Sequence, residues 1–195
     1  MSQKVLILCG SPRKKGNTNR LAAWFADGAA GSNATVETVD AARLRYKTNG
    51  CIACMKCKQS ELYECTVEDD AQPVLARMPE FDIIVMATPV YWFSPTAQLK
   101  LLMDRMFSLI KTDPATGAYT SPMTGKTLVL LSTAGGDFES GLNAVELTFR
   151  TAAKFVEMSY ESLLVPNSPA DPEDMEQNAA LKEQAMALGR RLTAG

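Results

Sequence analysis

The strongest constraint on the fold is a series of short apolar runs that alternate with segments of helical periodicity. Residues 4–9, 81–88 and 126–133 are nearly continuous apolar runs, which is typical of strands buried on both faces of a parallel sheet. Residues 34–40 alternate between apolar and polar side chains, a pattern that favours a strand nearer an edge. Residues 159–166 form a fifth run that ends at a proline. The sequence therefore predicts five strands.

Helical patterns separate these predicted strands. In the first of them, Leu21, Trp24 and Phe25 share one face, as expected of a helix that packs on a sheet. Further helical segments follow the later strands, and the last two cover residues 142–158 and 172–192. This alternation predicts an α/β fold in which a doubly wound parallel sheet of order 2-1-3-4-5 lies between two layers of helices.

The chain of 195 residues is long enough for a hydrophobic core. We expect a single domain over residues 1–195, with a cysteine-rich insertion at about 41–70, between the second and third strands. A second long connection covers residues 111–125. Long connections in compact domains are often functional, so both are candidates for a site.

Composition and charge exclude several classes of protein. The net charge is −2 and the only basic run is Arg13 to Lys15, so we expect no nucleic-acid partner. No run approaches 18 apolar residues and no signal sequence is visible, which predicts a cytoplasmic protein with reduced thiols and no membrane insertion. The chain contains no histidine, which excludes Ser-His-Asp and Cys-His catalysis and histidine-bound metals.

The connection after the first strand has the features of a phosphate-binding loop. It joins the carboxyl end of a strand to the start of a helix, where free N–H groups and the helix dipole attract an anion. Ser11, Asn17, Thr18 and Asn19 supply short polar side chains, and Arg13 supplies charge. The spacing matches neither G-x-x-x-x-G-K-[ST] nor G-x-G-x-x-G, which favours a monophosphate held without a metal. The alternative is an ordinary helix start capped by Asn17 or Thr18.

Two further loops at the same predicted sheet edge carry unusual residues. The loop after the third strand contains Tyr91, Trp92 and Phe93, an aromatic segment beside which a planar ring can lie. The loop after the fourth strand contains Gly135 and Gly136, which let the backbone approach a ligand closely. Aromatic residues alone are more often core or interface residues, but three such loops at one edge favour a ligand site.

These three segments resemble the FMN-binding segments of flavodoxin-like NAD(P)H-dependent FMN and quinone reductases. The matching stretches are residues 10–21, 88–105 and 132–136, and the resemblance runs from residue 4 to about residue 165. It implies a flavodoxin-like, three-layer fold with FMN at the sheet edge. It also implies a homodimer or homotetramer in which Trp92 and Phe93 have a second use at the interface near the flavin.

The resemblance assigns roles to particular residues. Four would hold the FMN phosphate, five would flank the isoalloxazine ring and three would contact its polar edge; Asn19 is a further candidate in the phosphate loop. The phosphate residues are Ser11, Arg13, Asn17 and Thr18. The residues beside the ring are Pro89, Val90, Tyr91, Trp92 and Phe93, and those at its polar edge are Ala134, Gly135 and Gly136. No side chain stands out as an acid–base catalyst.

Four cysteines lie within fifteen residues, with the spacing C-x₂-C-x₂-C-x₇-C at Cys51, Cys54, Cys57 and Cys65. Two-residue gaps allow thiolates from one tight loop to bind one iron–sulfur cluster. The run also resembles the motif of iron–sulfur flavoproteins, a branch of the same family with a 4Fe-4S cluster, although the last gap is long. Free thiols and a zinc site remain alternatives, and zinc comes last of the three because it more often uses two separate C-x₂-C pairs. Cys9 ends an apolar strand and is expected to be a core residue.

The sequence thus predicts an FMN-dependent oxidoreductase that passes electrons from NAD(P)H or a reduced carrier to a quinone, a flavin or a protein, with a 4Fe-4S cluster as a second centre. The alternative function is a non-catalytic iron–sulfur flavoprotein that carries electrons for a ferredoxin-like partner. A response-regulator-like domain is disfavoured, because the loop after the first strand lacks acidic residues.

Overall fold

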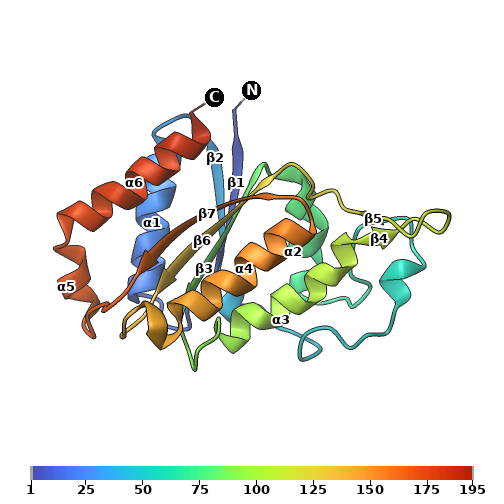
Figure 1. Cartoon of the computed structure of the whole chain (residues 1–195), viewed down its shortest axis with the longest axis horizontal. Helices are drawn as coiled ribbons and strands as arrows, with labels where there is room; N and C mark the ends of the chain where they lie inside the picture. Colours follow the sequence, from blue (N-terminus) through green and yellow to red (C-terminus); the bar gives the residue numbers. More distant parts are fainter. Residues whose placement is uncertain (1, 195) are drawn as a thin grey trace.

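The computed structural model describes residues 2–194, and its centre is a five-stranded, all-parallel sheet of order β2-β1-β3-β6-β7. This is the predicted 2-1-3-4-5 order, with the alternating strand β2 at an edge. Helices cover both faces of the sheet, and the two ends of the chain lie close together (Figure 1). The strands are β1 (Lys4–Cys9), β2 (Thr35–Val39), β3 (Ile83–Pro89), β6 (Thr127–Thr133) and β7 (Ser159–Val165).

The alternation of side chains along each strand divides the core into two layers. On one face, Leu6 and Leu8 of β1 pack towards α2 (Ala71–Arg77), α3 (Ala97–Arg105) and α4 (Asn143–Phe155). On the other face, Val5 and Ile7 pack towards α1 (Asn17–Ala30) and α6 (Ala179–Thr193), with α5 (Pro172–Glu176) at the same side. The central strands are buried on both faces, which explains their unbroken apolar sequence.

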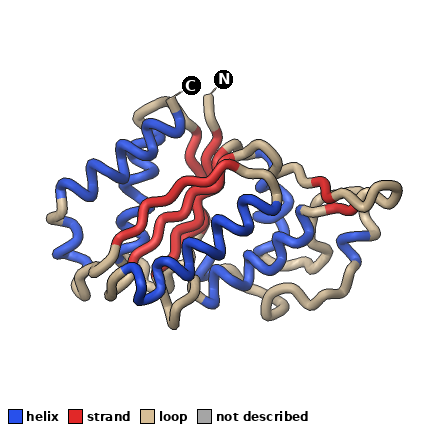
Figure 2. The backbone as a smooth tube through the Cα atoms, in the orientation of Figure 1, coloured by secondary structure: helices blue, strands red, loops and turns tan. Residues whose placement is uncertain are grey.

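Three features differ from the sequence prediction. The segment 172–192, predicted as one helix, is two helices, because Asn178 accepts a hydrogen bond from the backbone of Leu181 and caps a new helix. Helix α2 was not predicted, since Pro73 interrupts the helical pattern, although a proline is tolerated in a first turn. The connection 111–125 contains a small antiparallel hairpin of β4 (Lys111–Thr112) and β5 (Tyr119–Thr120) (Figure 2).

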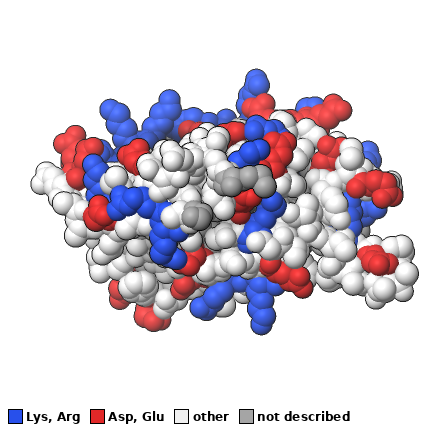
Figure 3. Space-filling model, turned by 90° about the horizontal axis from the view of Figure 1, so that it is seen from above, with Lys and Arg blue, Asp and Glu red and all other residues white. Residues whose placement is uncertain are grey.

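The surface carries positive and negative side chains side by side, as Figure 3 shows for one face. This mixture agrees with the small net charge. From residue 2 to residue 194, no helix has both the length and the apolar character needed to cross a membrane.

Candidate functional site

A cavity of about 400 Å³ opens at the carboxyl edge of the sheet. Loops that follow β1, β3, β6 and β7 meet there, as expected for an open α/β sheet, whose ligands bind beyond the carboxyl ends of the strands. The lining residues are Ser11, Arg13, Gly16, Asn17, Thr18, Pro89, Val90, Tyr91, Thr133, Ala134, Gly135, Ser168, Pro169 and Ala170. Most of the residues predicted to bind FMN are therefore brought together.

The loop between β1 and α1, residues 10–16, is the predicted phosphate-binding loop and is called the phosphate-type loop below. It leads into α1 without a side-chain cap. The N-cap residue is Gly16, and no side chain accepts a hydrogen bond from the first turn. The alternative of an ordinary start capped by Asn17 or Thr18 is therefore wrong: the Thr18 hydroxyl is buried and lies 2.7 Å from the hydroxyl of Thr133. An uncapped helix start leaves backbone N–H groups and the positive end of the dipole available to an anion.

The two asparagines of the loop brace it from within. The amide nitrogen of Asn17 donates to the carbonyl of Pro169 at 2.7 Å. The amide nitrogen of Asn19 donates to the carbonyls of Arg13 and Lys14, each at 3.2 Å. These donors are thus used by protein carbonyls, and Asn19 does not line the cavity. Direct phosphate contacts by the two side chains stay a prediction.

A fourth loop, residues 166–171, was missed at the sequence level. Asn167 and Ser168 donate backbone hydrogen bonds to the carbonyls of Gly136 and Ala134, at 2.8 and 2.7 Å. The next two residues, Pro169 and Ala170, lie against the phosphate-type loop. The available signal was topological: this loop follows the fifth strand and so must end at the same sheet edge.

The aromatic loop divides into an inner and an outer part. Pro89, Val90 and Tyr91 line the cavity, whereas Trp92 and Phe93 do not line it and are exposed. Trp92 is 92% exposed, and both outer residues have a left-handed backbone, with φ of 49° and 61°. A left-handed conformation at large residues costs roughly 1–3 kcal/mol each and is concentrated at functional sites.

The glycine loop divides in the same way. Ala134 and Gly135 line the cavity, and a Cβ at Gly135 would have no atom within 4 Å, so this backbone is open to a ligand. Gly136 faces the protein instead, because a Cβ there would lie 2.7 Å from the Cβ of Ser140.

The cavity fits FMN in size and chemistry. Its volume lies within the range of cofactor pockets, roughly 300–1,000 Å³. The buried hydroxyl of Ser11 and the guanidinium of Arg13 lie at the phosphate-type end, while Tyr91 lies at the end suited to a ring.

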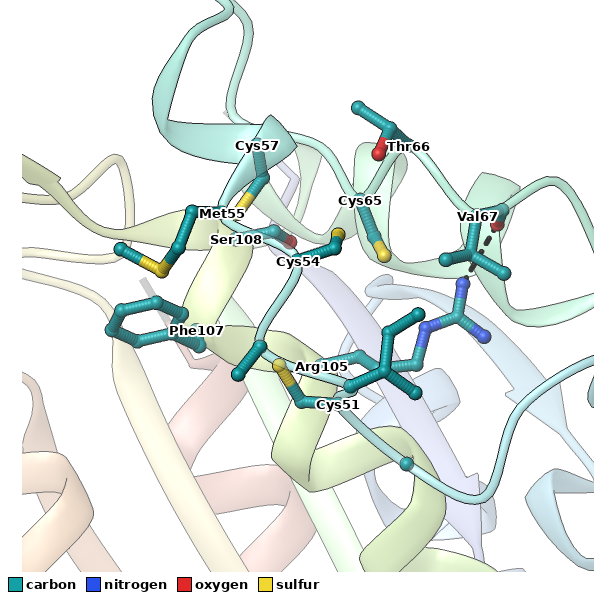
Figure 4. Close-up of a pocket in the computed structure, with 13 residues that line it drawn as sticks. Cys51, Cys54, Met55, Cys57, Cys65, Thr66, Val67, Arg105, Phe107 and Ser108 are labelled. Atoms are coloured by element: carbon teal, nitrogen blue, oxygen red, sulfur yellow. Dashed lines mark hydrogen bonds between the residues drawn. The ribbon is translucent and has the colours of Figure 1, made fainter.

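The cysteine segment lies elsewhere, beside the C-terminal half of α3 (Figure 1). Cys51, Cys54, Cys57 and Cys65 all line one small cavity, of about 20 Å³. Cys51 and Cys54 are exposed, Cys65 is half-buried and Cys57 is buried. Figure 4 shows the four side chains around this opening. Within residues 2–194, no three potential ligands are close enough to form a metal site as they stand.

Two lysines fasten this segment to the body of the protein. Lys58 donates to the carbonyl of Phe107 at 2.6 Å, and its ammonium lies 3.6 Å from the centre of the Phe107 ring. Lys111, at the start of the hairpin, donates to the carbonyls of Cys57 and Ser60. Lys58 thus ties the cysteine segment to the turn after α3, and Lys111 holds the segment by two of its backbone carbonyls. Both lysines add a positive charge near the thiols.

The thiols lie close enough to influence one another electrostatically. Burial raises the pKa of the Cys57 thiol, Lys58 opposes this rise, and the neighbouring Cys65 and Cys51 add to it. Mutual repulsion of deprotonated sulfurs is relieved when a metal or cluster binds them, because the metal carries the compensating positive charge. Four cysteines around one cavity are thus a suitable donor set for a cluster or zinc.

One lining residue of this cavity, Arg105, belongs to a buried ion pair with Asp69. The guanidinium of Arg105 donates to both carboxylate oxygens of Asp69, at 2.8 and 2.6 Å, and to the carbonyl of Val67 at 2.9 Å. The two side chains are 1% and 2% exposed. Burial alone raises the pKa of Asp69, but the Arg105 guanidinium and backbone N–H groups lower it overall.

Helix α3 connects the two sites. Its N-cap Thr96 donates from its hydroxyl to the carbonyl of Gly10 in the phosphate-type loop, at 2.7 Å. The other end of the helix and the turn after it place Arg105, Phe107 and Ser108 at the cysteine cavity.

The parallel sheet of this strand order and the cavity at its carboxyl edge define a flavodoxin-like α/β protein. A family model described as NADPH-dependent FMN reductase matches residues 3–167. The chain therefore belongs to the NADPH-dependent FMN reductase family.

Among curated proteins, the chain is similar to an iron-sulfur flavoprotein of Methanocaldococcus jannaschii, with 37% identity over 52% of this chain and 51% of that protein. It is also similar to an FMN-dependent NADH:quinone oxidoreductase of Methylocella silvestris, with 34% identity over 42% of this chain and 40% of that protein. The chain thus spans about half the length of the curated relatives it matches.

Solved structures confirm the fold along the whole chain. An NAD(P)H:quinone oxidoreductase from Methanothermobacter marburgensis superposes with a TM-score of 0.75 at 19% identity, covering 98% of this chain and 100% of that one. An FMN-dependent NADH-azoreductase from Bacillus anthracis, in complex with FMN, gives a TM-score of 0.73 at 16% identity, with coverage of 99% and 100%.

Proposed function

We propose that this chain is a single FMN-binding domain that acts as an oxidoreductase, passing electrons from NAD(P)H or a reduced carrier to a quinone, a flavin or a protein. The observation that carries this proposal is the convergence of four loops on one cavity at the carboxyl edge of the sheet. Family membership supports the choice of FMN and NAD(P)H.

Each part of the cavity has a role in this proposal. Ser11, Arg13 and the free N–H groups at the start of α1 bind the phosphate, and the buried Thr18 fixes the loop by its contact with Thr133. Tyr91 and the open backbone at Gly135 orient the ring and exclude water from one side. When bound, FMN supplies the redox chemistry, since it can accept a hydride and release its electrons in one or two steps.

The outer aromatic residues support a homodimer or homotetramer. Trp92 is almost fully exposed, with Phe93 packed edge-on against it at 5.8 Å between ring centres. Exposed aromatic anchors of this kind are typical of interfaces. A second copy of the chain that covers Trp92 also borders the cavity at Tyr91.

We propose further that Cys51, Cys54, Cys57 and Cys65 hold a 4Fe-4S cluster. Three observations support this: the four thiols line one cavity, Lys58, Lys111 and Arg105 supply positive charge nearby, and several similar proteins are named iron-sulfur flavoproteins. Two exposed cysteines on a connecting segment can close on a cluster as it assembles, because metal sites rarely exist fully formed without their metal. Zinc and free thiols are the competing occupants of this site.

The test is the absorption spectrum of protein purified without oxygen, followed by addition of NAD(P)H. We expect a flavin spectrum on top of the broad absorbance of an iron–sulfur cluster, which bleaches on reduction, and about four irons per chain. We also expect NAD(P)H to reduce the flavin at least as fast as the enzyme turns over. A flavin spectrum without iron would contradict the cluster, and zinc analysis would then separate zinc from free thiols. A protein that binds no flavin even with added FMN contradicts the central proposal.

The alternative function is a non-catalytic electron carrier for a ferredoxin-like partner, and the second centre proposed beside α3 supports it. The same experiment separates the two. A carrier would be reduced by dithionite or by a reduced ferredoxin, but not at a useful rate by NAD(P)H. The location of the protein in the cytoplasm stays a prediction.

A further inference from the structure

Arg105, the last residue of α3, is the largest fully buried side chain among the described residues. Two of its three guanidinium nitrogens have partners: one binds both oxygens of Asp69 and the other binds the carbonyl of Val67. The third, Nε, is buried and has no hydrogen-bond partner within residues 2–194. A buried donor without a partner loses its hydrogen bonds to water and gains none in return, so an acceptor is expected at this position when the site is filled.

The surroundings indicate what that acceptor is. Arg105 lines the cysteine cavity together with Cys65, and Figure 4 shows the Cys65 sulfur turned towards the guanidinium. A cluster-bound sulfur at Cys65 would therefore be an acceptor on the side of the cavity that holds the orphaned donor.

The guanidinium is held in a fixed orientation. Asp69 binds it with both oxygens and is itself fixed by the backbone N–H groups of Lys47, Ala71 and Gln72, at 3.0, 3.1 and 3.3 Å. Nη1 donates to Asp69 and Nη2 to the Val67 carbonyl, and hydrogen bonds from two nitrogens of one rigid, planar group fix its plane. The direction of the Nε–H bond is therefore fixed by the fold before any ligand arrives.

We infer that Arg105 is a positioning residue for the proposed cluster: its Nε–H donates a hydrogen bond to the Cys65 sulfur and so sets the reduction potential. This inference rests on the cluster proposed above. It accounts for Cys65, whose seven-residue separation from Cys57 leaves it without the tight-loop geometry of the other three cysteines. Hydrogen bonds to cluster sulfurs stabilise the more negative, reduced state and raise the potential.

The test compares conservative variants after reconstitution with ferrous iron and sulfide in the absence of oxygen. Arg105→Lys keeps the positive charge but removes the Nε–H donor and the planar fork. We expect it to retain its iron, to have a more negative midpoint potential than the wild type, and to lose iron to a chelator several-fold faster. Asp69→Asn keeps the donor and removes a negative charge, so its potential should move in the opposite direction.

The matched control is Arg45→Lys. Arg45 pairs with Asp70, the neighbour of Asp69, but this pair is exposed and does not line the cavity. Its potential and rate of iron loss should equal those of the wild type. A purely structural role for Arg105 predicts instead that Arg105→Lys lowers the unfolding midpoint and leaves the potential unchanged.

A second measurement needs no variant. In reduced wild-type protein labelled with ¹⁵N-arginine, electron spin echo modulation should show one nitrogen coupled to the cluster, because a hydrogen-bonded Nε lies close to the spin. A loaded wild type without this coupling, or an Arg105→Lys variant with the wild-type potential, overturns the role of Arg105 alone. A wild-type protein that holds neither iron nor sulfide overturns the cluster and this role together.

Discussion

The two candidate sites lie at opposite ends of α3 and are built in different ways. The proposed flavin site, at the carboxyl edge of the sheet, consists of loops whose positions follow from the order of the strands. Much of its lining is backbone, namely the uncapped start of α1 and the open chain at Gly135. The cysteine cavity lies in a segment with little regular structure, and side chains hold it, namely Lys58, Lys111 and the buried Arg105.

This difference determines how each site should respond to mutation. A site positioned by a sheet tolerates the loss of one side chain, because the remaining loops stay in place. A site held by a few buried polar contacts depends on each of them, since a partner left behind is buried without compensation. The predictions below test this contrast, beginning with the largest effect.

Replacing Arg105 by methionine should be the most destabilising change. It leaves the Asp69 carboxylate, which is 2% exposed, buried without its cation, and breaking a buried ion pair in this way costs about 3–5 kcal/mol. Urea unfolding followed by circular dichroism measures the loss. The exposed pair of Arg45 and Asp70 provides the control: Arg45→Met should leave the unfolding curve nearly unchanged. Equal losses of stability in Arg105→Met and Arg45→Met would contradict the proposed difference between the two sites.

Replacing Arg13 by alanine should weaken FMN binding without affecting the fold. A charge-assisted hydrogen bond to a phosphate contributes about 1.5–3 kcal/mol, which corresponds to a roughly 10–100-fold loss of affinity. Flavin fluorescence titrations measure it. Riboflavin lacks the phosphate and is the matched ligand, so its affinity should not change. An equal loss for both ligands would place Arg13 at the ring rather than at the phosphate.

Replacing Trp92 by alanine should weaken self-association. An interface aromatic anchor contributes about 2 kcal/mol, which corresponds to a roughly 30-fold increase in the dimer dissociation constant. Sedimentation at several protein concentrations measures it. Phe155 is also exposed, but it packs on Tyr119 of the hairpin at the cysteine side, so Phe155→Ala should leave the dimer intact. The reverse result would place the interface at the cysteine side.

The smallest effect concerns Cys9, at the end of β1. Burial, with a contribution from Asp40, raises the pKa of this thiol to about 11. The unfolded chain loses the thiol proton at a lower pH than the folded one, so stability is complete below the unfolded pKa and falls as the pH rises towards 11. We expect a loss of about 1.4 kcal/mol between pH 7 and pH 10. Cys9→Ala should remove this part of the pH dependence in denaturant unfolding.

The sequence predicted most of the residues that meet at the carboxyl-edge cavity, because its signals are short and topological. Apolar runs gave the strand order, and Ser11 and Tyr91 follow directly after strands, so they had to lie at the carboxyl edge. The loop 166–171 lacks a distinctive composition and was missed. The outward direction of Trp92 was not predictable either, because it depends on a left-handed backbone at a large residue, which sequence patterns do not reveal.

The cysteine cavity was predicted only as a set of ligands. The spacing from Cys51 to Cys65 indicated the cluster, but nothing in the spacing connects it to Arg105, which lies forty residues further along the chain. That contact forms because α3 packs beside the cysteine segment. A long-range ion pair between Arg105 and Asp69 leaves no periodic pattern, so it could be found only in the folded chain.

Helix α3 has a consequence for the distance between the two proposed redox centres. Thr96 contacts the phosphate-type loop and Arg105 the cysteine cavity, and at 1.5 Å per residue the nine-residue step between them measures about 14 Å. The length of α3 therefore fixes the separation of its two ends. Changes in the length of the surface loops do not alter this separation. One residue inserted into α3 would lengthen it by about 1.5 Å and turn the Arg105 end of the helix by about 100° relative to the Thr96 end.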